Sequence, residues 1–118
     1  MNPPAHPPLS PAAFHILLAL AGREKHGYAV MQEVEAQTGG RVAMGPGTLY
    51  GSLDRLQASG WVEECGAPRG EDADERRRYY RLTGAGRAVL KAEAQRLEQA
   101  VAQARTKGVL APSRSGRS

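Results

Sequence analysis

Apolar residues recur at helical spacing in three stretches of the first half of the chain, and turn-forming residues separate these stretches. The first helix is expected between the capping residue Ser10 and Gly22, and the second between Gly27 and the Gly39–Gly40 pair. A third helix is expected over about residues 46–59. Only one face of the third helix can be buried, because its apolar stripe consists of Leu49, Leu53 and Leu56.

Aromatic and β-branched residues then cluster in two short segments, Trp61–Cys65 and Arg78–Leu82, on either side of the polar stretch Gly66–Asp74. This pattern predicts a β-hairpin with a long tip. Thr83 is expected to cap a final helix that runs to about Lys107. The order helix-helix-helix-strand-strand-helix is the one that a winged helix-turn-helix domain requires. The expected fold class is therefore mainly α with a small β-hairpin.

The same pattern divides the chain into four segments. Residues 1–10 are expected to form a flexible proline-rich arm, residues 11–83 the winged domain, residues 84–107 the last helix and residues 108–118 a disordered basic tail. The N-terminal residues have neither the basic region nor the long apolar stretch of a signal peptide, so none is expected. The longest apolar run, Ile16–Ala21, is far below the roughly 20 residues that span a bilayer, so no membrane partner is expected.

Charge and composition narrow the class of function. The 118 residues include 16 Lys and Arg against 12 Asp and Glu, and the net charge of +4 favours a polyanionic partner without requiring one. The histidines at positions 6, 15 and 26 are scattered, and Cys65 has no second thiol for a disulfide or metal cluster. We therefore expect no enzyme, no metal and no cofactor, and a reducing, cytoplasmic compartment. Metal or redox sensing through Cys65 is the alternative.

The face of the third helix opposite the leucines carries side chains suited to a DNA groove. Thr and Ser hydroxyls can bond to bases or phosphates, Arg can pair bidentately with guanine, and small residues let the helix approach the groove floor. An ordinary solvated face is the alternative for this helix taken alone. The expected DNA-contacting residues of this helix are Thr48, Tyr50, Gly51, Ser52 and Arg55.

The hairpin is the second element that points to DNA, because its second strand begins with a cationic run. Guanidinium groups neutralise phosphates and fit a narrow minor groove. The expected wing contacts are Arg69, Arg76, Arg77 and Arg78. Acidic residues near the tip leave a self-neutralised loop as the alternative, and they are Glu71, Asp72, Asp74 and Glu75.

Several short motifs match a known family in order and spacing, over about residues 13–107. These motifs are His26-Gly27-Tyr28-Ala29-Val30, Gly45-Pro46-Gly47-Thr48-Leu49-Tyr50, Leu53-Asp54-Arg55-Leu56, Ser59-Gly60-Trp61-Val62-Glu63, and Arg77-Arg78-Tyr79-Tyr80-Arg81-Leu82-Thr83 followed by Gly86. With them the chain resembles the PadR family of transcriptional regulators, and in particular its short subfamily with a single C-terminal dimerisation helix.

The resemblance implies a bacterial-type dimeric repressor that reads a roughly palindromic operator in double-stranded DNA. By matching position it implies DNA contacts for Tyr28, Thr48, Tyr50 and the wing arginines. His26 and Tyr28 at the start of the second helix would position a phosphate. The alternative for Tyr28 is a half-buried core aromatic. The alternative for His26 is a solvated turn residue. The last helix lacks the aromatic residues with which some short members hold flat ligands, so a small-molecule effector stays unassigned.

The last helix and the first helix are expected to form a homodimer interface. A single helix that extends beyond a small domain has little surface of its own protomer on which to bury an apolar stripe, so a second protomer would cover it. The alternative is that the last helix folds back on its own domain. The expected interface residues are Phe14, Leu17, Leu90, Ala94, Leu97, Val101 and Ala104.

One different function stays open at this point. A winged fold can serve a protein partner instead of DNA, since fold does not fix function. Charge reversal at Arg77 and Arg78 distinguishes the two, because only DNA binding would lose affinity together with its salt dependence.

Overall fold

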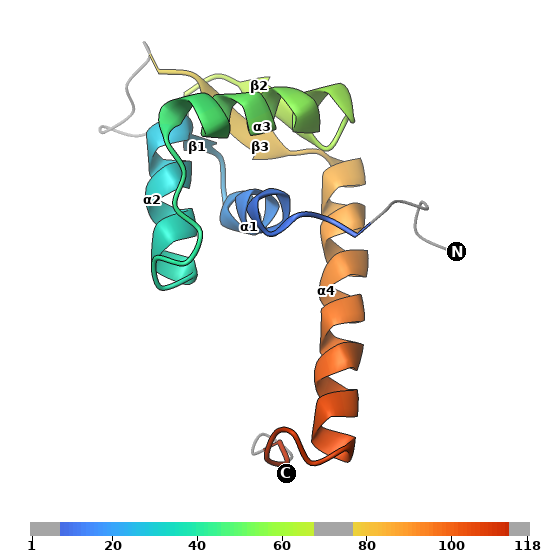
Figure 1. Ribbon diagram of the computed structural model, residues 1–118. Coiled ribbons are helices and arrows are strands. Elements are labelled where there is room, and N and C mark those ends of the chain that lie inside the picture. Colours follow the sequence, from blue (N-terminus) through green and yellow to red (C-terminus); the bar gives the residue numbers. More distant parts are fainter. Residues whose placement is uncertain (1–7, 68–76, 114–118) are drawn as a thin grey trace.

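The computed structural model of the chain describes residues 8–67 and 77–113. Figure 1 shows helices gathered around a small sheet, and the last helix projects from this cluster. The predicted arm before residue 8, the predicted tail beyond residue 113 and the tip of the hairpin lie outside the described residues. The elements are α1 (Pro11–Leu20), β1 (Lys25–His26), α2 (Gly27–Gln37), α3 (Pro46–Ala58), β2 (Val62–Cys65), β3 (Tyr79–Leu82) and α4 (Gly84–Thr106).

Side-chain caps fix where three of the described helices begin. Ser10 Oγ accepts a hydrogen bond from the Ala13 amide at 3.1 Å, and Thr83 Oγ1 accepts one from the Gly86 amide at 3.0 Å. Both residues were predicted as caps, and both satisfy a backbone donor that has no partner within its helix. The cap of α2 is His26, whose Nδ1 accepts from the Ala29 amide at 3.1 Å.

The sheet has three strands in the order β1-β3-β2, all antiparallel. The predicted hairpin is the β2–β3 pair, in which Val62 lies opposite Leu82. The charged residues 23–26 between the first two helices predict a turn, but Lys25 and His26 form a strand instead and pair with β3. Two residues are too short to show the alternation that identifies a strand in a sequence. β3 is thus the central strand and pairs on both edges.

The core lies between α1, the leucine stripe of α3 and the inner face of the sheet. Leu49 and Leu53 are fully buried and Leu56 nearly so, which confirms the buried face predicted for α3. α1 crosses the middle of the molecule and contacts α2, α3, α4 and β3. The other large buried side chains of the core are Ile16, Leu17, Leu20, Val30, Val34, Val62 and Tyr80.

The position of α1 overturns part of the predicted dimer interface. Leu17 is 0% exposed and Leu90 is 7% exposed, and both belong to the core of their own protomer. Because α1 is enclosed by other elements on most sides, the large apolar side chain that it exposes is Leu18, at 39%. Leu17 and Leu90 therefore cannot lie on a surface that a second copy covers.

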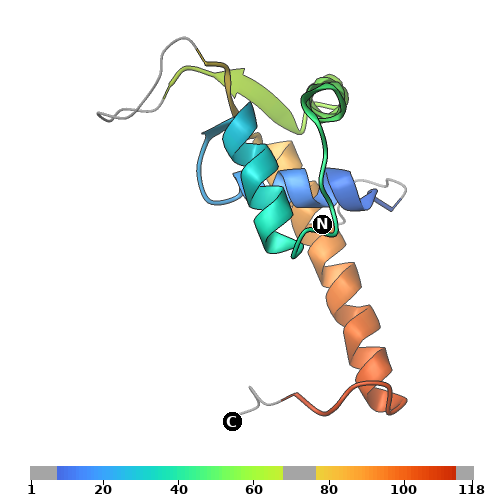
Figure 2. The same cartoon turned by 60° about the vertical axis from the view of Figure 1, so that its left-hand side comes forward.

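α4 packs on the domain only through its first turns. Val89, Leu90 and Glu93 are buried, whereas from Ala94 onward every residue of α4 except the half-buried Ala104 is exposed. Figures 1 and 2 both show the remainder of this helix projecting away from the other elements. The alternative in which the last helix folds back on its own domain is therefore wrong for most of its length.

Directly after α4 the backbone of residues 108–110 forms a hydrogen-bonded helix stop, where the sequence predicted a disordered tail. The Val109 amide donates to the Ala104 carbonyl at 2.8 Å, and the Gly108 amide donates to the Arg105 carbonyl at 3.1 Å. This pair of bonds is the Schellman arrangement that satisfies the last carbonyls of a helix. The prediction of disorder rested on the Ser, Gly, Pro and Arg content of this segment. It overlooked Gly108, whose positive φ is the stop signal of the helix.

Candidate nucleic-acid interface

The outward face of α3 is the first part of a continuous surface at one end of the molecule. Thr48, Tyr50 and Arg55 are exposed, as predicted, and Gly51 between them is half-buried. Gly51 leaves room beside the helix, since a Cβ at that position would meet only Arg55 Nη1, at 3.8 Å. This face therefore combines one aromatic ring, one hydroxyl and one guanidinium around Gly51, where the helix backbone carries no side chain.

Ser52 does not lie on this face, and its predicted exposure is wrong. Its side chain is 6% exposed, and its Oγ accepts a hydrogen bond from Arg55 Nη2 at 3.3 Å. Ser52 stands three residues after Leu49 and four before Leu56, so the helical period places it within the buried stripe. It holds the guanidinium of Arg55 in place and has no free access to a groove.

Asp54 was missed by sequence reasoning, although it lies on the exposed face of α3. It follows Tyr50 by four residues, so the two side chains are neighbours on the helix surface. The same period that identified the leucine stripe could have placed this carboxylate. A carboxylate on a groove-facing surface repels phosphates but can accept a hydrogen bond from the amino group of cytosine.

The start of α2 forms the second part of the surface. Tyr28 is 54% exposed and does not belong to the core, which disagrees with the alternative of a half-buried core aromatic. His26 is not a solvated turn residue either, because it caps α2 and its ring meets the Tyr79 ring edge-on at a centroid distance of 5.5 Å. The capping position directly before the first helical residue was the signal for this role.

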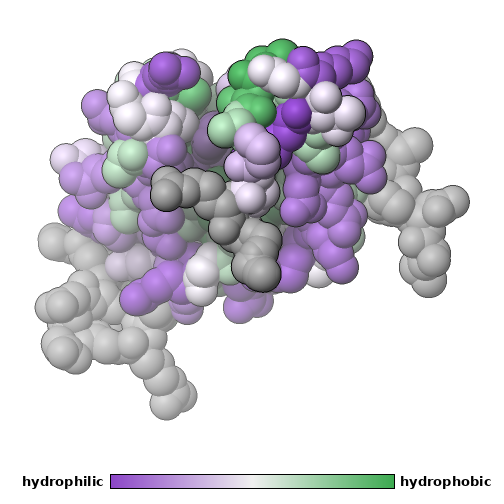
Figure 3. All heavy atoms as spheres, turned by 90° about the horizontal axis from the view of Figure 1, so that it is seen from below, coloured by the Kyte–Doolittle hydropathy of each residue, from purple (hydrophilic) through white to green (hydrophobic). Residues whose placement is uncertain are grey.

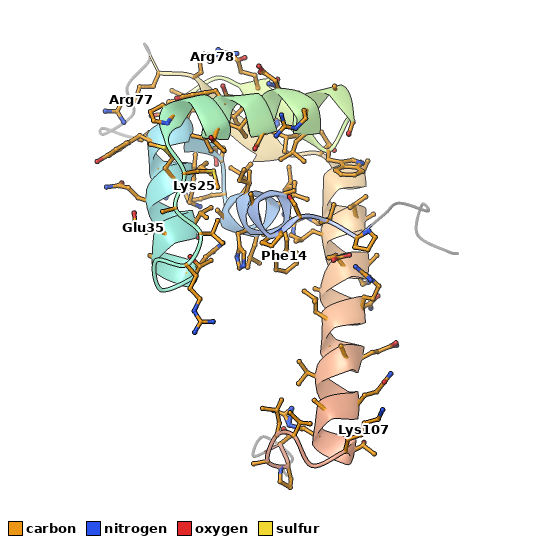
Figure 4. All side chains as sticks on the ribbon, in the orientation of Figure 1. Phe14, Lys25, Glu35, Arg77, Arg78 and Lys107 are labelled. Carbon is orange, nitrogen blue, oxygen red and sulfur yellow. The ribbon has the colours of Figure 1, made fainter. Side chains whose placement is uncertain are left out.

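The wing forms the third part, and it joins the start of α2. Arg77 Nη1 lies 2.8 Å from Nε2 and 3.1 Å from Nδ1 of His26, so the base of the wing touches the cap of α2. Figure 4 shows Arg77 and Arg78 at the same end of the molecule as α3, with Lys107 at the opposite end. The predicted contacts Arg69 and Arg76 lie outside the described residues.

Acidic residues on β2 pair with the arginines of β3 and its approach. Arg78 Nε and Nη2 donate to the two carboxylate oxygens of Glu64 at 3.2 and 3.1 Å, and Arg81 Nε donates to Glu63 at 2.7 Å. The bond to Glu64 raises the pKa of Arg78 above its ordinary value. Sequence reasoning considered only the acidic residues of the hairpin tip, which lie outside the described residues. The pairing of the two strands, which places Glu63 opposite Arg81, was the signal that could have identified these ion pairs.

Cys65 is the last residue of β2. It is half-buried, and burial is the main cause that raises the pKa of its thiol, partly offset by Arg81. Within residues 8–67 and 77–113, no three His, Cys, Asp or Glu side chains gather as a metal ion would need. Among these same residues, no helix has both the length and the apolar character to cross a membrane.

Comparison with known proteins decides the family. The family model described as "Transcriptional regulator PadR-like family" matches residues 16–92, which is more than half of the 118-residue chain. The chain belongs to the PadR-like family of transcriptional regulators. This confirms the resemblance seen in the sequence motifs. It also confirms that the protein is a regulator and not an enzyme.

Relatives of this PadR-like protein agree with the assignment. It is 43% identical over 86 residues to the transcriptional regulator Rv3488 of Mycobacterium tuberculosis (strain ATCC 25618 / H37Rv), a match that covers 72% of this chain and 74% of that protein. It is 40% identical over 79 residues to an uncharacterized 37.1 kDa protein in transposon TN4556 of Streptomyces fradiae. That match covers 67% of this chain, but the chain spans only 21% of the length of the transposon protein.

A solved structure supports the fold. The crystal structure of a PadR family transcription regulator from Clostridium difficile R20291 superposes with a TM-score of 0.65 and covers 86% of this chain and 100% of that one, at 16% identity. This PadR-like protein therefore has the expected fold class, a mainly helical winged helix-turn-helix with a small sheet. The sheet has three strands where the sequence predicted two.

Proposed function

We propose that this PadR-like regulator is a repressor that binds a roughly palindromic operator in double-stranded DNA as a homodimer, in the cytoplasm. In this proposal α3 enters the major groove, the start of α2 positions a phosphate and the wing lies along the backbone. The proposed contacts are His26, Tyr28, Thr48, Gly51, Arg55, Arg77 and Arg78, together with Arg69 and Arg76 of the wing.

The contact between the wing and the helix-turn-helix is the observation that carries the proposal. Arg77 reaches His26 at 2.8 Å, so a cationic side chain of the wing and the exposed start of α2 share one surface. Tyr28 extends this surface because more than half of its side chain is exposed. Amides at a helix start and guanidinium groups both favour phosphate oxygens, and together they form the footprint expected for a DNA backbone.

Exposed apolar residues on α4 support the homodimer. Leu97 is 45% exposed and Val101 is 40% exposed, and α4 turns this stripe to solvent along the part that projects from the domain. Viewed from below, hydrophilic residues cover most of the surface of the molecule (Figure 3). A second copy would bury Leu97 and Val101 at about 1.5–3 kcal/mol for each one fully covered. The proposed interface is Phe14, Ala94, Leu97, Val101 and Ala104, with Leu18 added.

Charge reversal in the wing tests the proposal. Arg77→Glu with Arg78→Glu should weaken operator binding by at least about tenfold, and should reduce the salt dependence of the affinity by about one counterion for each lost phosphate contact. The matched control is Arg105→Glu, which reverses a charge in the last turn of α4. Binding unchanged in affinity and salt dependence would instead favour a regulator that acts through a protein partner.

A further inference from the structure

Tyr50 lies where the three parts of the proposed DNA surface meet. Its ring packs against Tyr80 of β3 at a centroid distance of 6.5 Å, and its hydroxyl lies against Gly27, the first residue of α2. The guanidinium carbon of Arg78 in turn stands 5.9 Å from the centroid of the Tyr80 ring. A single side chain of α3 therefore touches the start of α2 and the strand that leads out of the wing.

The glycine at position 27 is explained by this contact and not by backbone conformation. Gly27 is not among the residues with a positive φ, so its backbone conformation is open to alanine. A Cβ at this position would collide with the Tyr50 hydroxyl oxygen and would lie 2.7 Å from its Cζ and 2.9 Å from its Cε1. Gly27 thus leaves the space that the end of the Tyr50 side chain occupies.

Tyr80 gives the ring of Tyr50 a fixed support. Tyr80 is 0% exposed and belongs to the central strand, where it pairs with Lys25 on one side and Glu64 on the other. Tyr50 itself is only 37% exposed, so most of its surface is covered by its own protein. A side chain held in this way has less freedom to follow a base than Thr48, which is exposed on the same helix.

We infer that Tyr50 is a positioning residue, which sets the placement of α3 relative to the start of α2 and the wing and does not itself read the operator. The inference rests on the proposed DNA binding. Phosphate contacts fix the register of a protein on the duplex, and base contacts from α3 form only when that register is correct. Misplacing α3 against α2 therefore weakens every contact made by the surface at once.

Gly27→Ala tests the inference without removing any group that could contact DNA. The added methyl group displaces the end of a partly exposed side chain, which can rotate away, so the thermal midpoint should change by no more than a few degrees. Operator affinity should fall about tenfold. Gly84→Ala is the matched control, because Gly84 is the first residue of α4 and has open space around it. Its affinity should equal that of the unmodified protein.

A double-mutant cycle separates positioning from direct contact. Tyr50→Ala should lower affinity about as much as Gly27→Ala, and the double variant should bind no worse than Tyr50→Ala, because the collision is then absent. Tyr50→Phe keeps the ring on Tyr80 and should bind within about twofold of the unmodified protein. If Gly27→Ala loses stability, the comparison of Tyr50→Phe with Tyr50→Ala still decides the matter.

Three results would overturn the inference. The first is an operator affinity of Gly27→Ala equal to that of the unmodified protein. The second is a loss of affinity in the double variant that equals the sum of the two single losses. The third is a loss of affinity in Tyr50→Phe as large as that in Tyr50→Ala, which would mean that the hydroxyl contacts DNA. Failure of the unmodified protein to prefer its operator would instead reject the proposed function. In that case the contact itself is checked by the Gly27 amide resonance in the free protein, which should shift in Tyr50→Ala; an unmoved resonance would reject the contact.

Discussion

Glu64 limits the charge that the wing can offer to DNA. Its carboxylate holds the guanidinium of Arg78 through two hydrogen bonds, although both side chains are largely exposed. An exposed pair of this kind contributes little to stability, because water screens its attraction. The same carboxylate competes with phosphate for Arg78, so its main effect falls on DNA binding.

Replacing Glu64 by Gln should therefore strengthen operator binding. The variant frees Arg78 and removes a negative charge from the surface, and the affinity should rise roughly threefold at low salt. Fluorescence anisotropy with a labelled operator measures the change. Glu63→Gln is the control, because Glu63 pairs with Arg81 and adjacent strand residues point to opposite faces. Weaker binding by Glu64→Gln would mean that the ion pair holds Arg78 in its binding position.

Cys65 should react slowly with alkylating reagents in the folded protein. Burial raises the pKa of its thiol, so at a given pH below that pKa the folded state holds less of the reactive thiolate than the unfolded state does. The iodoacetamide rate, followed against pH with and without denaturant, should rise at a higher pH in the folded protein. A curve at lower pH than in denaturant would contradict this and favour a redox role for Cys65.

At the scale of the elements, α4 is placed by a close approach to the backbone of Trp61, directly before β2. A Cβ on Gly86 would collide with the Trp61 carbonyl oxygen and lie 2.8 Å from the carbonyl carbon. That oxygen also accepts a hydrogen bond from the Thr83 amide at 3.1 Å, so it cannot move aside freely. Glycine at this position lets the first turn of α4 pack directly on the backbone at the start of β2.

Gly86→Ala should consequently destabilise the fold by about 1–3 kcal/mol. The neighbouring Gly84→Ala meets open space and should stay within about 0.5 kcal/mol of the unmodified protein. Urea unfolding followed by the fluorescence of Trp61 gives both values. Equal stability of the two variants would show that the start of α4 can shift away from Trp61 at no cost.

The elements themselves could largely be predicted from the sequence, because helical period, caps and glycine stops are local signals. Burial of Leu49 and exposure of Thr48 follow from that period alone. β1 could not be predicted in this way, since its two residues are a strand only through pairing with β3. The burial of Leu17 likewise depends on how many elements surround α1, which no single helix pattern contains.

At the scale of the whole molecule, the projecting part of α4 predicts that a second copy of the chain covers it. The molecule measures 50 × 31 × 28 Å along its principal axes, and its long axis reflects a helix that its own domain does not cover. Leu97 and Val101 contribute little to the protomer core because each is at least 40% exposed. Dimerisation and folding of the winged domain should therefore be separable by mutation.

Leu97→Glu with Val101→Glu should give a folded monomer. The charges would lie at the proposed interface, where burial without partners costs several kcal/mol, while the winged domain keeps its core. Sedimentation or light scattering at low micromolar concentration should show twice the 12.6 kDa chain mass for the unmodified protein and the single mass for the variant. The monomer should also lose most operator affinity, since one protomer spans one half-site. A monomeric unmodified protein would contradict the proposed interface.

The central proposal is that the surface made by α3, the start of α2 and the wing binds a specific DNA sequence. The most direct test is to compare binding of the purified protein to its own promoter fragment and to a scrambled fragment of equal length, at low and near-physiological salt. Preference for the promoter that persists near physiological salt is the predicted result. Equally weak binding to both fragments, lost as salt rises, would reduce the surface to a generic cationic patch and would contradict the proposal.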